Sequence, residues 1–290
     1  MKLSIITINY NNAEGLRKTL ASVASQTYRD IEHIIIDGGS SDGSVDVIRE
    51  YESTNRSCDN PLIIIWSSEP DKGIYNAMNK GILKATGNYV WILNSGDCVA
   101  MEETVERMMN VIIESKKYMP ILMGNILHLY PDGQRSPSKE KHPDIVKTPQ
   151  PIYASMFTFY RGTIPHDAAF VRRDLFEKYG LFDETMKICA DWKLYLNMIA
   201  LGDVVPMYVN LDVVLFDMTG ISNTNNELRL LERRTYLKEI IPTSVLKDYD
   251  RFGNDISIMQ RLHRHSWAYC IVWFIERVLF KLEKWNILNK

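Results

Sequence analysis

Residues 4–11 read Ser-Ile-Ile-Thr-Ile-Asn-Tyr-Asn, a short β-rich apolar run that ends in polar side chains. Similar apolar runs recur along the first hundred residues. Between them, apolar side chains return every three or four positions, as in helices. The runs at 33–36 and 62–66 are typical of strands buried on both faces of a sheet. Repeated strand–helix–strand units predict a parallel sheet with right-handed crossovers. Strands are predicted at 3–8, 33–36, 62–66 and 89–93, and helices at 13–25, 44–51 and 74–85.

The second half of the chain is less regular. Five prolines among charged residues predict a long loop over 131–151. From residue 226 onward the pattern is helical to the end, so the chain divides into an α/β domain, 1–225, and a helical extension, 226–290. Between the loop and the extension, strands are predicted at 168–172, 207–209 and 213–216, and helices at 174–179 and 191–200.

The composition is that of an ordinary globular protein of 290 residues, 46% hydrophobic and 24% charged. Its formal net charge of -2 argues against a nucleic-acid partner. The four cysteines are far apart and form no CxxC pair, so we expect reduced thiols in a cytoplasmic setting. The sequence has neither a signal-peptide pattern at its start nor an apolar stretch of about 18 residues that would span a membrane.

Polar side chains follow all four predicted N-terminal strands. Asn9 follows the first, Asp37 the second, Asp71 the third and Asp97 the fourth. Ligands of open parallel sheets bind beyond the carboxyl ends of the strands, so four polar ends on one edge favour a binding site. Taken singly, Asp37 is equally explained by turn chemistry and Asp97 by capping of a following helix.

These side chains suit a nucleoside diphosphate. Asp37 could accept a hydrogen bond from a base, and Asp71 could serve the base or the ribose. A diphosphate is bound together with a hard cation, and Mg²⁺ takes one or two carboxylates plus phosphate oxygens. Asp97, at the end of an apolar strand, is therefore the candidate ligand for Mn²⁺ or Mg²⁺.

Several blocks in the first half of the chain resemble the family 2 glycosyltransferases. The block from 71 to 82 (Asp-Lys-Gly-Ile-Tyr-Asn-Ala-Met-Asn-Lys-Gly-Ile) looks most like the branch that acts in colanic-acid and exopolysaccharide clusters. Many members carry two acids around the metal, whereas Ser95 and Gly96 precede a single acid here. The resemblance covers about residues 1–220. The other blocks that carry it are 4–11, 26–28, 36–43, 85–87 and 93–97.

The resemblance implies a GT-A fold over 1–225, with a mostly parallel central sheet flanked by helices. It also implies a nucleotide-sugar donor along the sheet edge, with a divalent metal on Asp97. The residues expected to contact the donor are Thr7, Asn9, Asp37, Asp71, Gly73, Asn79, Lys80 and Ser95.

Residues 188–194 (Ile-Cys-Ala-Asp-Trp-Lys-Leu) resemble the family's later acidic motif, whose Asp is the catalytic base. Asp191 lies in the first turn of a predicted helix, where the helix dipole favours a carboxylate. Stabilisation of that helix start is the alternative role. The family often has a His at the position of His166. His166 could contact the acceptor, the diphosphate or the metal, or it could be an ordinary loop residue.

The implied roles predict an inverting displacement that moves one sugar per encounter. The acceptor would be a glycan or lipid-linked glycan in surface polysaccharide, capsule or exopolysaccharide biosynthesis. Asp97 would hold the metal–diphosphate and Asp191 would act as general base. UDP, GDP and dTDP sugars fit equally well. The alternative is a catalytically degenerate nucleotide- or glycan-binding module of a polysaccharide assembly complex.

Residues 266–288 predict an amphipathic helix. From 257 to the end the chain carries six basic and two acidic residues, a charge of +4. Basic residues with interfacial tryptophans suit the inner face of the cytoplasmic membrane. Packing on the core or on a second subunit is the open alternative, and the oligomeric state stays open too. The apolar stripe comprises Trp267, Ile271, Phe274, Val278, Leu282 and Trp285, and the basic face comprises Arg277, Lys281 and Lys284.

Overall fold

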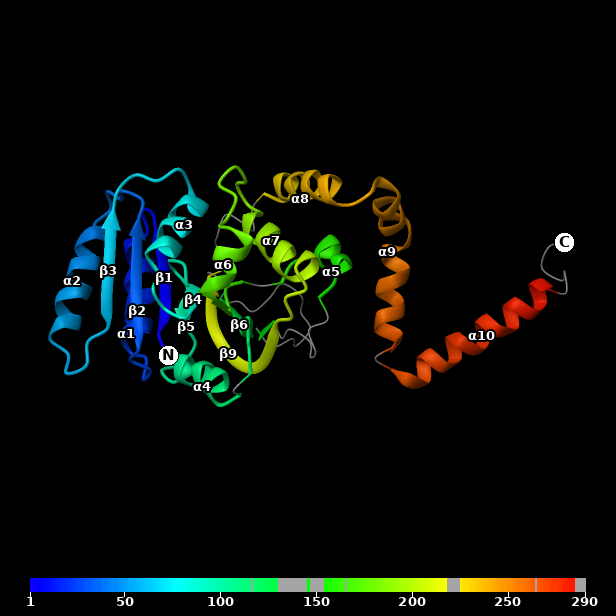
Figure 1. The fold of residues 1–290 in the computed structure, drawn as a ribbon, viewed down its shortest axis with the longest axis horizontal. Helices are drawn as coiled ribbons and strands as arrows, with labels where there is room; N and C mark the ends of the chain where they lie inside the picture. The colour runs from blue at the N-terminus through cyan, green and yellow to red at the C-terminus, as the bar shows by residue number, and fades with distance from the viewer. Residues whose placement is uncertain are drawn as a thin grey trace. The chain divides into compact units, whose positions relative to one another are not determined.

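The computed structural model describes residues 1–115, 117–129, 145–146, 154–164, 166–217, 225–263 and 265–284. The chain forms two compact units, Met1–Thr235 and Tyr236–Lys290 (Figure 1). Within the described residues, no helix is long and apolar enough to cross a membrane.

The first unit opens with alternating strands and helices, as predicted. They are β1 (Leu3–Asn9), α1 (Ala13–Ala24), β2 (Ile31–Asp37), α2 (Ser44–Arg56), β3 (Ile63–Ser68), α3 (Ile74–Lys84) and β4 (Tyr89–Ile92). The later strands are β5 (Cys98–Val99), β6 (Ile121–Leu129), β7 (Ile145–Val146), β8 (Ala169–Arg172) and β9 (Met207–Asp217). The later helices are α4 (Thr104–Ser115), α5 (Met156–Arg161), α6 (Arg173–Tyr179), α7 (Ala190–Tyr195), a π-helical segment (Leu196–Leu201), α8 (Asn226–Ile240), α9 (Thr243–His263) and α10 (Ser266–Lys284).

The strands form a single mixed sheet in the order β3-β2-β1-β4-β8-β6-β9-β5, with β7 paired to β6. The first four strands pair in parallel, β2 with β3 and β1 with both β2 and β4. β8 then runs antiparallel to β4 and to β6. The parallel part therefore brings the carboxyl ends of β1, β2, β3 and β4 to one edge.

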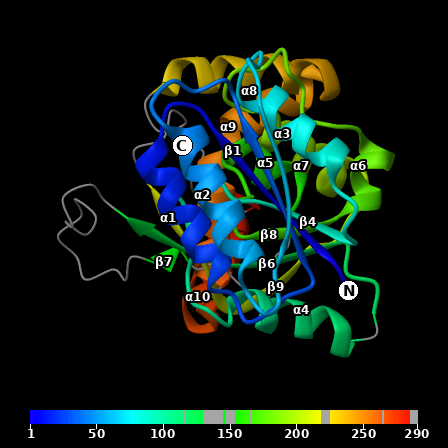
Figure 2. The same cartoon turned by 90° about the vertical axis from the view of Figure 1, so that its left-hand side faces the viewer.

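Helices cover both faces of this sheet (Figures 1 and 2). On one face, α1 and α2 pack over β2, where Leu16, Leu20, Val47 and Ile48 contact Ile35. On the other face α3 packs closely on β1, because Gly81 leaves no room for a Cβ against the Ile6 side chain. The glycine lets the helix approach the strand and so holds the start of α3 near the polar edge.

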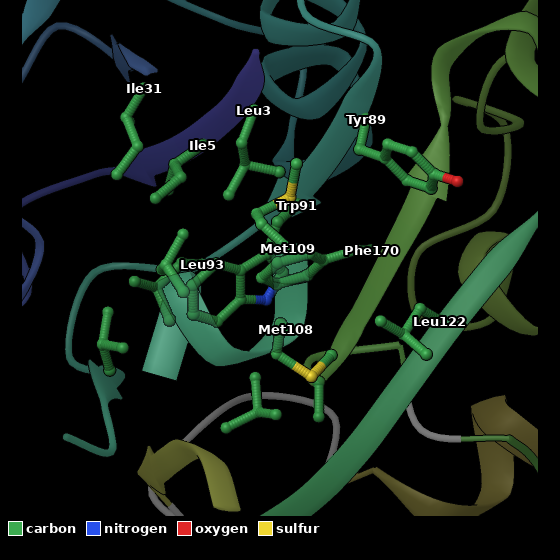
Figure 3. Close-up of a cluster of buried hydrophobic side chains, with 14 of the residues drawn as sticks. Leu3, Ile5, Ile31, Tyr89, Trp91, Leu93, Met108, Met109, Leu122 and Phe170 are labelled. Atoms are coloured by element: carbon green, nitrogen blue, oxygen red, sulfur yellow. The ribbon is translucent and has the colours of Figure 1, made fainter. Parts of the chain in front are cut away.

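A large apolar cluster contains Trp91 and Phe170, whose rings lie 5.0 Å apart between the sheet and α4 (Figure 3). Both side chains are fully buried. The indole Nε1 of Trp91 donates a 2.6 Å hydrogen bond to the carbonyl oxygen of Asp167. Packing of the core thus sets where the chain turns before β8.

Two strand predictions need correction. β3 was predicted as a buried strand, but Ile63 is exposed and the rest of the strand is half-buried because β3 lies at the edge of the sheet. The strands predicted at 207–209 and 213–216 form one strand, β9. The polar residues between them stay in the strand because the Asn125 side-chain amide donates to Asn210 and Asp212 across a register shift.

Other predictions differ in extent. The helix predicted at 191–200 is α7 followed by the π-helical segment. α4 and β6 lie in a stretch for which no element was predicted. The loop predicted at 131–151 lies outside the described residues except for 145–146, which form β7. The predicted C-terminal helix is α10, and its last residues, from Trp285 onward, lie outside the described residues.

Candidate functional site

The polar edge of the parallel sheet is organised around Asp37. Its Oδ1 accepts hydrogen bonds from Asn9 Nδ2 at 2.8 Å and Ser40 Oγ at 2.6 Å, and its Oδ2 accepts one from Ser68 Oγ at 2.6 Å. The side chain is fully buried. Burial by itself raises the pKa of this carboxyl, but the hydrogen bonds from Ser40, Ser68 and Asn9 outweigh it and lower the pKa. Asp37 is therefore a carboxylate that ties the ends of β1, β2 and β3 together.

Thr7 and Asn9 both belong to β1, but Thr7 lies inside the strand and Asn9 is its last residue. Thr7 is fully buried within β1, with its Oγ1 3.0 Å from Nε2 of His33. Burial lowers the pKa of His33 to about 3, so this imidazole is neutral, and its Nδ1 lies 2.9 Å from the Tyr51 hydroxyl. Asn9, at the end of the strand, binds Asp37, and its Oδ1 is buried without a hydrogen-bond partner. Thr7 thus belongs to a buried polar chain beneath the edge.

Asp71 reaches the same edge from the loop before α3. Its Oδ1 accepts a 2.9 Å hydrogen bond from the amide of Gly73. Its Oδ2 lies where a Cβ on Gly38 would approach to 2.6 Å, so a larger residue at position 38 would displace the Asp71 carboxylate from its present place. Gly73 has φ +122°, which favours glycine at this start of α3.

The side chains of Asn79 and Lys80 bind other residues of the same unit. The side-chain Nδ2 of Asn79 donates to the carbonyl oxygen of Phe182 and to Oε1 of Glu184, both at 2.9 Å. The Lys80 ammonium lies 2.9 Å from Oε1 of Glu69. Asn79 therefore holds the loop that leads towards α7, and Lys80 pairs with a residue after β3.

Ser95 and Asp97 follow β4. The amide of Ser95 donates to the carbonyl of Ile8 at 3.1 Å, which docks this turn against β1. Asp97 is 4% exposed, and its Oδ1 accepts a 2.8 Å hydrogen bond from the amide of Asp217 at the end of β9. Burial raises the pKa of Asp97 to about 8. The charges of Asp167 and Asp217 add to that rise, while the Asp217 amide and the charge of His166 oppose it.

Asp167 and Asp217 were not among the residues selected from the sequence. Asp217 follows the last predicted strand, so the strand-end argument applied to β1–β4 would have found it. Asp167 directly follows His166, but only the turn held by Trp91 brings its carboxyl towards Asp97. The structure therefore surrounds the single acid of the 93–97 block with further carboxylates from distant segments.

The carboxylates around Asp97 are few for a divalent cation bound by protein alone. Within the ranges that the structure describes, no three His, Cys, Asp or Glu side chains are arranged to hold a metal ion. A diphosphate-bound Mg²⁺ needs only one or two carboxylates, since phosphate oxygens and water complete its shell. Asp97 fits that smaller requirement, because a cation there would offset both the burial of its carboxylate, which is the main reason that its pKa is raised, and the negative charges of Asp167 and Asp217.

His166 joins the remaining acids. Its Nδ1 lies 3.1 Å from Oδ2 of Asp191, and its Nε2 lies 3.3 Å from Oδ1 of Asp167 in an ion-pair contact without hydrogen-bond geometry. The hydroxyl of Tyr75 lies 3.0 Å from the other oxygen of Asp191. Burial opposes protonation of the imidazole, but the charges of Asp167 and Asp191 raise the pKa of His166 to about 10.

Asp191 is consequently ionised. Burial raises its pKa, but the positive charge of His166 and hydrogen bonds from His166 and Tyr75 lower it overall. His166 also interacts electrostatically with Asp97. Asp97 and Asp191, predicted as metal ligand and as base, are far apart in the sequence but belong to one cluster. The positive charge of the His166 imidazolium partly neutralises the acids of this cluster.

The comparisons with known proteins agree on one class. The model of the family described as "Glycosyl transferase family 2" matches residues 4–180. An uncharacterised glycosyltransferase of Mycobacterium tuberculosis strain H37Rv is 32% identical over 222 residues, 76% of this chain and 77% of that protein. A "PGL/p-HBAD biosynthesis glycosyltransferase" of Mycobacterium bovis strain BCG is 27% identical over 236 residues, 79% of this chain and 82% of that protein.

Two solved structures share the fold. Staphylococcus aureus TarS 1–349 in complex with UDP aligns with a TM-score of 0.56 and 16% identity over 75% of this chain and 61% of that chain. Mannosyltransferase PcManGT from Pyrobaculum calidifontis, in complex with GDP-Man and Mn²⁺, aligns with a TM-score of 0.53 and 17% identity over 80% of this chain and 60% of that chain. The predicted α/β fold of the GT-A type, with a helical C-terminal part, is confirmed.

The His166 cluster predicts a pH dependence of stability. The pKa of His166 in the folded protein, about 10, lies above the ordinary histidine value of 6.5, so the stabilisation is complete below about pH 6.5 and is lost as the pH rises towards 10. Removing the His166 imidazolium leaves the carboxylates of Asp167 and Asp191 without their counter-ion, which lowers the free energy of unfolding by on the order of 3 kcal/mol. We expect His166→Gln to be less stable than wild type near pH 6.5, with the difference shrinking towards pH 10.

The measurement is urea unfolding in chelator between pH 6.5 and 10. His265→Gln, a substitution of an exposed histidine, is the control and should follow wild type throughout. A difference between His166→Gln and wild type that stays constant over this range would contradict a protonated His166.

Proposed function

Because the chain belongs to glycosyltransferase family 2, we propose that it moves a single sugar from a nucleotide-diphospho-sugar to a glycan or lipid-linked glycan acceptor. The observation that carries this proposal is the meeting of Asp97 and Asp191 in one cluster through His166. The transfer would take place on the α/β domain, residues 1–225, with 226–290 as a helical extension.

The donor would lie along the polar edge of the sheet. TarS is in complex with UDP or UDP-GlcNAc, and PcManGT with GDP-Man and Mn²⁺, on the same fold. We place the nucleoside beside Asp37 and Asp71 and the diphosphate beside Asp97. The donor contacts proposed from sequence are Thr7, Asn9, Asp37, Asp71, Gly73, Asn79, Lys80 and Ser95. The burial of Thr7 and Asp37 and the contacts of Asn79 and Lys80 favour a supporting role for these four.

A Mn²⁺ or Mg²⁺ held by Asp97 and the donor phosphates would neutralise charge on the leaving group. The carboxylate of Asp191 is ionised and accepts the proton of the attacking acceptor hydroxyl. The acceptor oxygen bonds to the anomeric carbon as the carbon–phosphate-oxygen bond breaks, so the configuration inverts. His166 and Tyr75 fix the two Asp191 oxygens during this step.

A second function has one observation in its favour. The 93–97 block supplies a single acid, and no described trio of ligands surrounds it. A catalytically degenerate module that binds a nucleotide or a glycan in a polysaccharide assembly complex would need no more. Such a module would bind nucleotide without releasing nucleoside diphosphate from any sugar donor.

The colanic-acid-like block at 71–82 supports a place in exopolysaccharide or capsule biosynthesis.

Within its own unit, α10 exposes a stripe of large apolar side chains, among them Trp267 at 68% and Phe274 at 66%. A helix with such a stripe and a basic flank lies in a membrane interface when anionic lipid is present. We propose that 266–288 contacts the anionic cytoplasmic face of the membrane, near lipid-linked acceptors.

Donor binding predicts a metal-dependent thermal shift. UDP, GDP, dTDP and their sugars are compared with and without Mn²⁺ by scanning fluorimetry. One nucleotide should stabilise the protein, with about 2.7 kcal/mol at 100 times its Kd. Asp97→Asn should lose the metal-dependent part of the shift, whereas Asp46→Asn, an exposed acid of α2, should keep it. Equal shifts in Asp97→Asn and wild type would exclude Asp97 as the ligand.

The role of Asp191 is tested by donor hydrolysis. Release of nucleoside diphosphate from the stabilising sugar nucleotide should fall by about 10²–10⁴-fold in Asp191→Asn, because the amide cannot take the proton. Asp46→Asn serves again as control. Near-normal turnover in Asp191→Asn would refute its role as base, and no turnover in wild type with any donor, despite binding, would support the module instead.

Membrane contact is tested by liposome flotation. The protein should float with vesicles that contain anionic phosphatidylserine and stay behind with neutral vesicles. Phe274→Glu, in the middle of the apolar stripe, should abolish flotation, whereas Cys270→Ser on the polar side should not. If wild type stays behind with both vesicles and sediments as a dimer, the stripe is a subunit interface.

A further inference from the structure

Glu232, on α8, binds three consecutive backbone amides of another segment. Its Oε1 accepts from the amide of Lys187 at 2.6 Å, and its Oε2 accepts from Ile188 at 3.1 Å and Cys189 at 2.9 Å. These residues directly precede α7, which begins at Ala190 and carries Asp191 in its first turn. Glu232 therefore contacts the backbone immediately before Asp191.

The start of α7 needs such an acceptor. The first amides of a helix have no partner within the helix. Cys189, at the cap position, makes no side-chain capping hydrogen bond. The carboxylate of Glu232 satisfies the first of these amides, that of Cys189, together with the two amides that precede it, and hydrogen bonds to a charged acceptor are stronger than neutral ones. It also places negative charge at the positive end of the helix.

Further contacts hold the same segment. The hydroxyl of Tyr75, whose single proton is shared between the Asp191 carboxylate and this segment, lies 2.6 Å from the carbonyl oxygen of Ile188, while the amide of Ile188 donates to Glu232. The peptides around Ile188 are therefore held on two sides, from α3 and from α8. The guanidinium of Arg233 lies 5.3 Å from the ring centroid of Trp192, so α8 also packs on α7 itself.

We infer that Glu232 is a positioning residue for the general base: by binding the amides of 187–189, it sets the start of α7 and the place of the Asp191 carboxylate against His166. The inference rests on the proposed role of Asp191. It also gives a part in the reaction to a residue of α8 that lies beyond residue 225 but still within the first compact unit. A displacement of the base by about 1 Å can cost 10²-fold in rate.

The experiment combines kinetics and hydrogen exchange. Release of nucleoside diphosphate is measured for wild type, Glu232→Gln, Asp191→Asn and the double variant, with Glu239→Gln, an exposed acid of the same helix, as control. Glu232→Gln keeps the side-chain size but replaces one acceptor oxygen by a donor. We expect kcat to fall by about 10- to 100-fold with little change in the donor KM, and Glu239→Gln to match wild type.

The double variant separates positioning from general destabilisation. If Glu232 acts through Asp191, Glu232→Gln has no further effect on kcat in the Asp191→Asn background. Equal fold-losses in both backgrounds, or unchanged kcat in the single variant, would overturn the inference while leaving the role of Asp191 intact. If Asp191→Asn alone retains near-normal turnover, the proposed function fails instead.

Amide exchange gives a readout that does not need turnover. Glu232→Gln should speed deuterium uptake in peptides that cover 187–195 and leave peptides from β1 and β2 unchanged. Unchanged uptake at 187–195 would overturn the inference even if no donor is turned over. If Glu232→Gln does not fold, Glu232→Asp, which keeps both oxygens on a shorter side chain, is measured in the same way and should show the same changes in smaller size.

Discussion

The parallel pairing of β1 with both β2 and β4 is the constraint on which the site depends. It forces the carboxyl ends of three strands to one edge, and the helices that return the chain cannot fill that edge. Asp37 then joins the ends by hydrogen bonds from three segments. These hydrogen bonds fix the strand ends relative to one another without any ligand, as the proposed donor site requires.

The second half of the sheet adds charge to this edge. β8 and β9 bring Asp167 and Asp217 towards Asp97, and burial makes that concentration of carboxylates unfavourable. The imidazolium of His166 offsets part of the repulsion and at the same time keeps Asp191 ionised. One buried cation therefore links the stability of the fold to the protonation state of the proposed base.

The 71–82 block also supports the segment around Asp191. Tyr75 contacts the carbonyl oxygen of Ile188 and the carboxylate of Asp191, and Asn79 binds the loop that leads towards α7. Glu232 approaches the same loop from α8. The proposed base, Asp191, is thus held by segments on both sides of it in the sequence, and the position of its carboxylate depends on their packing.

The sequence by itself determined the alternating strands and helices of the first hundred residues, because their hydrophobic periodicity is local. It also selected Asn9, Asp37 and Asp97, because each lies at the end of a predicted strand, and Asp191, because residues 188–194 resemble a family motif; their roles in the reaction stay predictions. Only the tertiary structure decided that β3 is an edge strand, that β9 is continuous through its polar middle, and that Asp167, Asp217 and Glu232 approach the site. These features depend on pairing and packing between distant segments, and local periodicity carries no information about which segments become neighbours.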